Sequence, residues 1–252
     1  MKYFFLILTV TLLSMPNSIS AIRVQIPKPL FESKGSASNR SVSVYNDADT
    51  MKPLQVSITK RSHDLDGNEN FEKTADFDIF PGQFIIQPDQ EQVITLRYIG
   101  AHPIDREIAY RVIVEELPVN LARPKEVSGR AESQLSITLK FIKSIYVLPK
   151  GSIKPEVSIH SIAPFETEKK EKKLLLILEN KGKQHFLLTQ ALLTVSSALK
   201  ENISHTPVEI KLETKDIREG NLLSNDQRRL FLDWPASLPF GPVTATLKVQ
   251  NK

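Results

Sequence analysis

Residues 135–149, with the sequence LSITLKFIKSIYVLP, place apolar and polar side chains in alternation. This is the period of a β-strand that has one apolar and one polar face. The apolar positions are Leu135, Ile137, Leu139 and Phe141. Lys143 follows on the same face, so a face that could be buried ends with an ammonium group. The chemistry within reach of this segment is non-covalent binding through apolar side chains and one cation.

Residues for covalent or metal chemistry are sparse in the rest of the chain. The sequence has no cysteine, no Gly-x-Ser-x-Gly elbow, no phosphate loop and no Gly-x-Gly-x-x-Gly motif. The five histidines have no metal-ligand spacing to one another; they are His63, His102, His160, His185 and His205. We therefore expect no enzyme, no metal and no cofactor, with a catalytic site distributed over the chain as the alternative.

Residues 1–21 have the pattern of a secretory signal peptide. Lys2 precedes an almost entirely apolar run, and small residues follow it up to Ala21. The formal charge is +4, and removal of Lys2 leaves +3 (4 − 1). The basic residues are scattered without an aromatic stacking platform, so we expect no nucleic-acid partner.

The mature chain is predicted to be all-β. Short segments rich in β-branched or aromatic residues alternate with turn formers, which is typical of antiparallel sandwiches. The segments in the first half are 41–46, 54–60, 77–80, 84–88, 92–99 and 109–118. Those in the second half are 156–162, 173–180, 185–195, 207–213, 228–234 and 244–250. We expect two sandwich domains, 22–149 and 150–252, joined at a break that contains Gly151 and Pro155.

Two details of this pattern bear on the arrangement of the domains. A strand, an Asn, a polar turn and a second strand occur in both halves, in VSVYNDADTMKPLQVSI and in LLILENKGKQHFLLTQAL, which indicates domains of similar plan. Arg97 and Glu107 lie among charged residues near apolar strands. They are either ordinary surface ions or a partly buried pair at the seam between the domains, where a pair would fix orientation more than stability.

Four segments in the correct order resemble the periplasmic pilus chaperones of the chaperone–usher pathway, the PapD-like proteins. They are NDADTMKPLQVSI, FDIFPGQFIIQPDQEQVITLRYIG, DREIAYRVIVEELP and LSITLKFIKSIYVLP. The resemblance covers residues 40–149 and fades in the second half, where only the strand plan supports it. The Gln-Pro and Arg-Tyr pairs look closer to the archaic branch of the family.

The resemblance implies two immunoglobulin-like domains in a boomerang arrangement, in the periplasm. It also implies that residues 135–143 are donated as a β-strand to a pilus subunit, which is then delivered to an outer-membrane usher. The four alternating apolar residues would fill the subunit's groove. Lys143 matches one of two basic residues that bind the subunit's terminal carboxylate. Lys28 matches the other, which is usually an arginine, and Arg23 is the fallback.

Other readings remain open at this point. An exported β-sandwich adhesin, or a structural component of a surface fibre, would also be all-β and secreted. Such a component would favour an extended N-terminal donor segment, whereas IRVQIPKPLFES contains two prolines. Lys143 by composition alone is a solvated strand end. The sequence also leaves open whether the free protein dimerises by capping its own donor strand.

Overall fold

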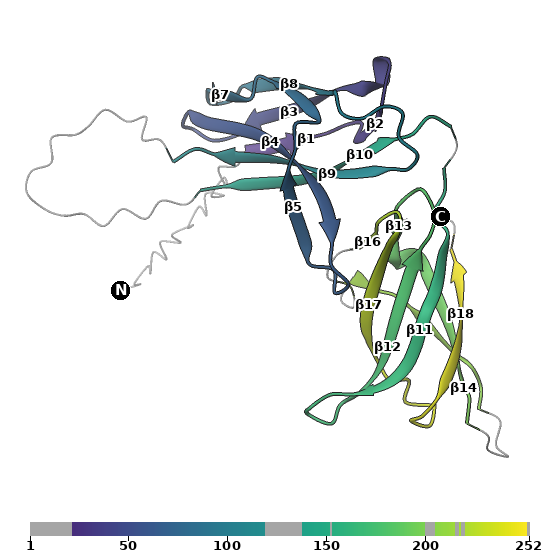
Figure 1. The fold of residues 1–252 in the computed structure, drawn as a ribbon. Helices are drawn as coiled ribbons and strands as arrows, with labels where there is room; N and C mark the ends of the chain where they lie inside the picture. The colour runs from purple at the N-terminus through teal and green to yellow at the C-terminus, as the bar shows by residue number, and fades with distance from the viewer. Residues whose placement is uncertain are drawn as a thin grey trace, which may run out of the picture.

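The computed structural model describes residues 22–118, 138–151, 153–199, 205–214, 217 and 220–250. Within these ranges the chain forms strands and two short 3-10 turns, and none of its helices is long and apolar enough to cross a membrane. The expected signal peptide lies outside the described residues. Figure 1 shows two β-sandwiches that meet end to end at an angle.

The first sandwich consists of two sheets. One has the order β1-β3-β8-β6, and the other has the order β2-β10-β9-β4-β5, with β7 also paired to β4. The strands of the first sheet are β1 (Ile22–Gln25), β3 (Asn39–Asn46), β8 (Glu91–Tyr98) and β6 (Phe77–Phe80). Those of the second are β2 (Leu30–Glu32), β10 (Lys140–Leu148), β9 (Ile108–Glu116), β4 (Lys52–His63), β5 (Glu69–Lys73) and β7 (Gln83–Ile86). A 3-10 turn, η1 (Ser36–Ser38), precedes β3.

The second sandwich contains three smaller groups of strands. They have the orders β11-β12-β17, β13-β16 and β15-β14-β18. Their bounds are β11 (Val157–Glu166), β12 (Lys172–Asn180), β13 (Phe186–Leu187), β14 (Ala191–Ser197), β15 (Val208–Lys211), β16 (Asn221–Leu222), β17 (Asp226–Asp233) and β18 (Val243–Val249). The 3-10 turn η2 (Leu188–Gln190) divides the single strand expected over 185–195. In the described residues, no strand of one sandwich pairs with a strand of the other.

Buried and exposed side chains alternate along the strands that form each core. In β8, Ile94 and Leu96 are fully buried, while their neighbours along the strand face solvent. In β12, Leu174, Leu176 and Leu178 are fully buried in the second core. Burial of each such side chain contributes roughly 1.5–3 kcal/mol, so cores of this size need no disulfide.

Asn46 and Asn180 show that the repeated sequence pattern is a repeated structure. Each is fully buried at the end of a strand, and each side-chain amide donates to the carbonyl four residues later, at Thr50 and Gln184 respectively. Each side-chain oxygen accepts a hydrogen bond from the backbone N–H two residues later. The polar turn after the strand is therefore held in both domains by an asparagine that replaces missing backbone partners.

Candidate functional site

The first feature of the candidate site is an open sheet edge. β10 pairs with β9 from Lys140 to Val147, but it pairs with β2 only from Tyr146 to Leu148. Between Lys140 and Ile145, no described strand pairs with the other edge of β10. An unpaired edge presents backbone N–H and C=O groups that can accept a further strand.

The apolar face of β10 is divided between the sandwich and solvent. Phe141 and Leu139 are half-buried, and Phe141 packs against the first core across from Val114. Ile142 points to the other face of the sheet and is 42% exposed. Leu135 and Ile137 lie outside the described residues. Sequence reasoning missed Ile142, because it falls on the positions that alternation assigns to polar side chains.

Lys143 and Lys28 lie at the end of this open edge, and both are exposed. Neither forms an ion pair or hydrogen bond with any residue of the described part of the chain. Lys143 lies across from Val112 on the face that packs into the sandwich, whereas Leu30 pairs with Tyr146 on the opposite face. The Tyr146 N–H donates to the Pro29 carbonyl, so Lys28 precedes the residue that meets β10 where its open edge ends.

Arg23, the fallback for Lys28, lies in the other sheet. It forms a two-bond fork with Asp47, at 3.0 and 3.1 Å, and its guanidinium covers the ring of Tyr45. These contacts already engage its charge, and β1 has no pairing with β10. The geometry favours Lys28 over Arg23.

The expected pair of Arg97 and Glu107 does not form. Arg97 projects from the outer face of β8 and pairs with Asp78 of the neighbouring strand β6, where both side chains are about half exposed. Glu107 lies just before β9, and its side chain is 1% exposed. Its partner is a histidine of the second domain. Strand pairing places Arg97 in the other sheet, so proximity along the sequence did not predict contact.

Glu107 and His185 form the centre of the seam between the domains. His185 Nδ1 lies 2.8 Å from Glu107 Oε1, and the same oxygen accepts the backbone N–H of His185. The imidazole stacks on Tyr146 of β10, with ring centroids 4.2 Å apart. The Tyr146 hydroxyl in turn accepts a hydrogen bond from Asn221. Tyr146 is three residues from Lys143, so the end of the open edge adjoins the second domain.

A second contact between the domains comes from the turn between β4 and β5. This turn, Asp64–Asn68, reaches beyond its own sheet to β17 (Figure 1). Arg229 donates to both carboxylate oxygens of Asp66 at 2.7 Å, and its backbone N–H donates to the Leu65 carbonyl at 2.7 Å. The sequence LDGNEN predicts only a turn at this stretch. The Asp66-Gly67 dipeptide, a strong hairpin signal, was the available clue.

A buried ionic cluster lies where this hairpin leaves the sheet. Glu69 pairs with Arg61 and with Arg111, and Arg111 also donates to Ser144 of β10. Burial alone would raise the pKa of Glu69. The hydrogen bond from Arg111 and the charge of Arg61 outweigh this effect and hold that pKa below its ordinary value of 4.5. The cluster thus joins β4, β5, β9 and β10 through a carboxylate that stays ionised at neutral pH.

The sequence matches the model of a known protein family. The sequence model of the pili and flagellar-assembly chaperones, PapD N-terminal domain, matches residues 23–151, which is just over half of the chain. No curated protein sequence matches the chain.

Three solved structures illustrate the likeness in fold. One is a chaperone–tip adhesion subunit pre-assembly complex from the archaic chaperone-usher Csu pili of Acinetobacter baumannii, with a TM-score of 0.56, 16% identity, and coverage of 90% of this chain and 98% of that one. The class 5 fimbriae chaperone CfaA has a TM-score of 0.53 and 14% identity over 92% and 100% of the two chains. The E. coli chaperone DraB has a TM-score of 0.50 and 15% identity over 89% and 88%.

These structures share the two-sandwich fold, and the residues matched by the family model, 23–151, span the whole of β10. The chain belongs to the family of pili and flagellar-assembly chaperones typified by PapD.

Proposed function

We propose that this chain is a periplasmic, non-enzymatic chaperone that holds fimbrial subunits by lending them the strand 135–143, and then delivers them to an outer-membrane usher. Family membership supports the general role. The observation that carries the strand donation is the edge of β10 between Lys140 and Ile145, to which no described strand pairs, with the exposed Lys143 and Lys28 near its end.

The energetics suit a strand exchanged between chains. A subunit that lacks one strand exposes an apolar groove and two strand edges, which invite aggregation. Backbone pairing to the open edge satisfies those edges, while alternate side chains such as Leu139 and Phe141 enter the groove. Each large side chain that becomes fully buried contributes roughly 1.5–3 kcal/mol before ordering costs.

The apolar groove of the subunit does not fix the register of the donated strand, and the two lysines would fix it. A slip of two residues leaves the same face of a strand inward, so apolar filling tolerates it. Lys143 and Lys28 are both exposed near the end of the open edge, where they would reach a subunit carboxylate. A lysine cannot form the two parallel hydrogen bonds that an arginine forms with a carboxylate. Two ammonium groups would therefore bind the subunit carboxylate as point charges.

The open edge also suggests an oligomeric state for the protein when no subunit is bound. Ile142 is exposed beside the edge, and a second copy of the chain could cover both by pairing with it. We include this self-capped dimer in the proposal as the resting form that a subunit displaces. Dilution before subunit addition should then speed subunit capture.

Co-expression with a panel of fimbrial subunits tests the proposal. The readout is soluble subunit recovered with the exported chain, for the wild type and for Lys143→Ala, Lys28→Ala and Lys140→Ala. Lys140 is the matched control, because it lies on the same strand but pairs with Glu115. We expect retention by the wild type and the control, and loss in the other two variants. Equal retention by all four would reject the lysine anchor. No retention by any would reject subunit binding and favour a structural fibre component.

A further inference from the structure

Among the described residues, one small apolar cluster joins the two domains. It consists of Ala109 and Tyr146 from the first domain and Leu223 from the second, with Leu148 packed beside them. Domains that share little apolar surface move relative to one another unless other contacts fix them. Polar and ionic contacts must therefore set the angle between these sandwiches.

The turn between β4 and β5 provides such contacts on one side of the joint. Asp66 and Arg229 form a fork with two hydrogen bonds of 2.7 Å, which fixes direction as well as distance. The Leu65 carbonyl accepts a third bond from the backbone of the same arginine. Gly67 approaches the buried guanidinium of Arg228 so closely that a Cβ there would lie 2.3 Å from Nη1.

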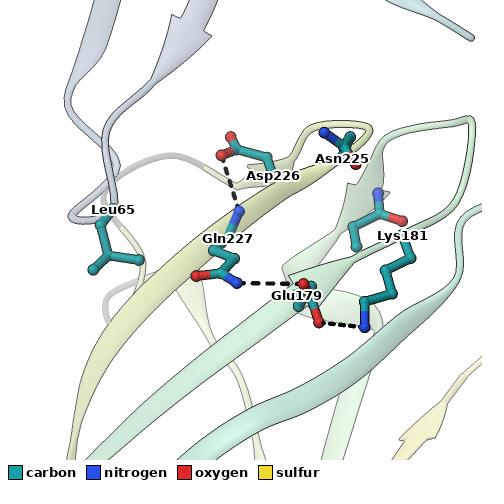
Figure 2. A pocket seen from close by; sticks show the side chains of 7 residues that line it. Leu65, Glu179, Lys181, Asn225, Asp226 and Gln227 are labelled. Carbon is teal, nitrogen blue, oxygen red and sulfur yellow. Dashed lines mark hydrogen bonds and ion pairs between the residues drawn. The ribbon is translucent and has the colours of Figure 1, made fainter.

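A pocket of about 510 Å³ lies beside these contacts, between the turn and the second domain. Leu65 lines it on the side of the turn, and polar residues at β12 and β17 line it on the side of the second domain. Figure 2 shows Leu65 across this space from Glu179 and Gln227, which bond to each other rather than to the turn. Beside this pocket the turn contacts the second domain through the bonds of Leu65 and Asp66 and through the close approach of Gly67 to Arg228.

We propose that this turn, Asp64–Asn68, is a clamp that sets the angle between the domains and thereby positions the open edge of β10 for its subunit. The proposal rests on the proposed function. A subunit that reaches Lys143 adjoins the second domain, since Tyr146 lies in the seam three residues away. A loosened angle would therefore reduce the fraction of molecules that can engage the subunit with both domains. Asp66 and Arg229 are positioning residues in this scheme.

Distance measurement across the joint tests the clamp without any subunit. The chain has no cysteine, so Thr95→Cys and Glu209→Cys, both at exposed sites on different domains, can carry spin labels in otherwise intact protein. We expect Asp66→Ala to broaden the distance distribution. The matched control is Asp47→Ala, which removes a similar exposed fork, that of Arg23, from within the first domain. The double variant Asp66→Arg with Arg229→Asp should restore most of the narrow distribution.

The affinity for a subunit tests whether the clamp positions the open edge of β10. The probe is a subunit that the wild type retains in co-expression, titrated against each purified variant. If the clamp keeps the domains in the competent angle, and its loss reduces that population to about a fifth, the Kd rises about fivefold. The charge-swapped pair should recover it, and Asp47→Ala should not change it.

An unchanged distance distribution in Asp66→Ala would overturn the clamp. A broadened distribution with an unchanged Kd would overturn its role in positioning the edge. Failure of the wild type to retain any subunit is the separate failure of the proposed function, and the distance distributions would still decide whether the turn sets the angle.

Discussion

Asn46 and Asn180 occupy equivalent places in the two domains, each fully buried at a strand end. The Asn180 amide also lies within hydrogen-bond distance of the carbonyls of Leu222 and Leu223, so it joins β12 to the segment before β17. Asn46 reaches Ile86 of β7 in the same way. In each sandwich, one side chain thus closes a turn and connects two strands that do not pair with each other.

We expect Asn180→Ala to destabilise the second domain strongly. The substitution leaves buried backbone carbonyls and N–H groups without partners, at about 1–3 kcal/mol for each group. Urea unfolding should show a midpoint lowered by the equivalent of at least about 2 kcal/mol. Asn70→Ala, at an exposed site on β5, is the control and should change little. Equal midpoints for both variants would contradict this role of Asn180.

The repeat was visible in the sequence because its residues are local. Strand, Asn and polar turn are contiguous in both halves, and alternation identified most long strands within a few residues of their bounds. The short strands β1 and β2 were missed, because Pro27 and Pro29 interrupt their pattern. At η2 the sequence LLTQALL allows a short helix, but its β-branched flank favoured a strand, and the structure forms a 3-10 turn there.

The contacts between domains were much less predictable. Arg97 and Glu107 are close in sequence, but Arg97 lies in β8 of one sheet and Glu107 just before β9 of the other, and the true partner of Glu107 is 78 residues away. The fork of Asp66 and Arg229 spans 163 residues. No periodicity encodes such pairs, since they depend on how two finished sandwiches meet. Ile142 was missed for a related reason: a strand at an open edge can expose an apolar side chain on its polar face.

Glu107→Ala should weaken the seam. His185 would lose the acceptor for both its ring N–H and its backbone N–H, in a position where water has little access. We expect a loss of about 2 kcal/mol in the free energy of unfolding, and Glu107→Gln should recover part of it by restoring one acceptor. The measurement is urea denaturation of the full chain. Similar losses in both variants would show that charge, rather than hydrogen bonding, holds the seam.

The lowered pKa of Glu69 predicts acid sensitivity at the base of the hairpin. A carboxylate with a folded-state pKa below its unfolded value of 4.5 stabilises the fold fully above that value. The contribution is lost as the pH falls from about 4.5 through the lowered folded-state pKa. Unfolding free energies measured between pH 3 and pH 7 should therefore decline more steeply at the acidic end in the wild type than in Glu69→Gln. Parallel curves would show that the pairing with Arg61 and Arg111 is energetically silent.

Gly67→Ala should disturb the hairpin more than backbone strain alone explains. Gly67 has a φ of +81°, which costs an alanine about 1 kcal/mol or more, and the added Cβ would also collide with the Arg228 guanidinium. Gly151 has a φ of +103° with no neighbouring atom within 4 Å of an added Cβ, so Gly151→Ala reports the strain alone. We expect Gly67→Ala to lower the free energy of unfolding by about 1 kcal/mol more than Gly151→Ala, as for a modest overpacking. Because Arg228 lies next to Arg229, Gly67→Ala should also broaden the inter-domain distance distribution. A distribution as narrow as in the wild type would show that the variant strains the backbone without displacing Arg228.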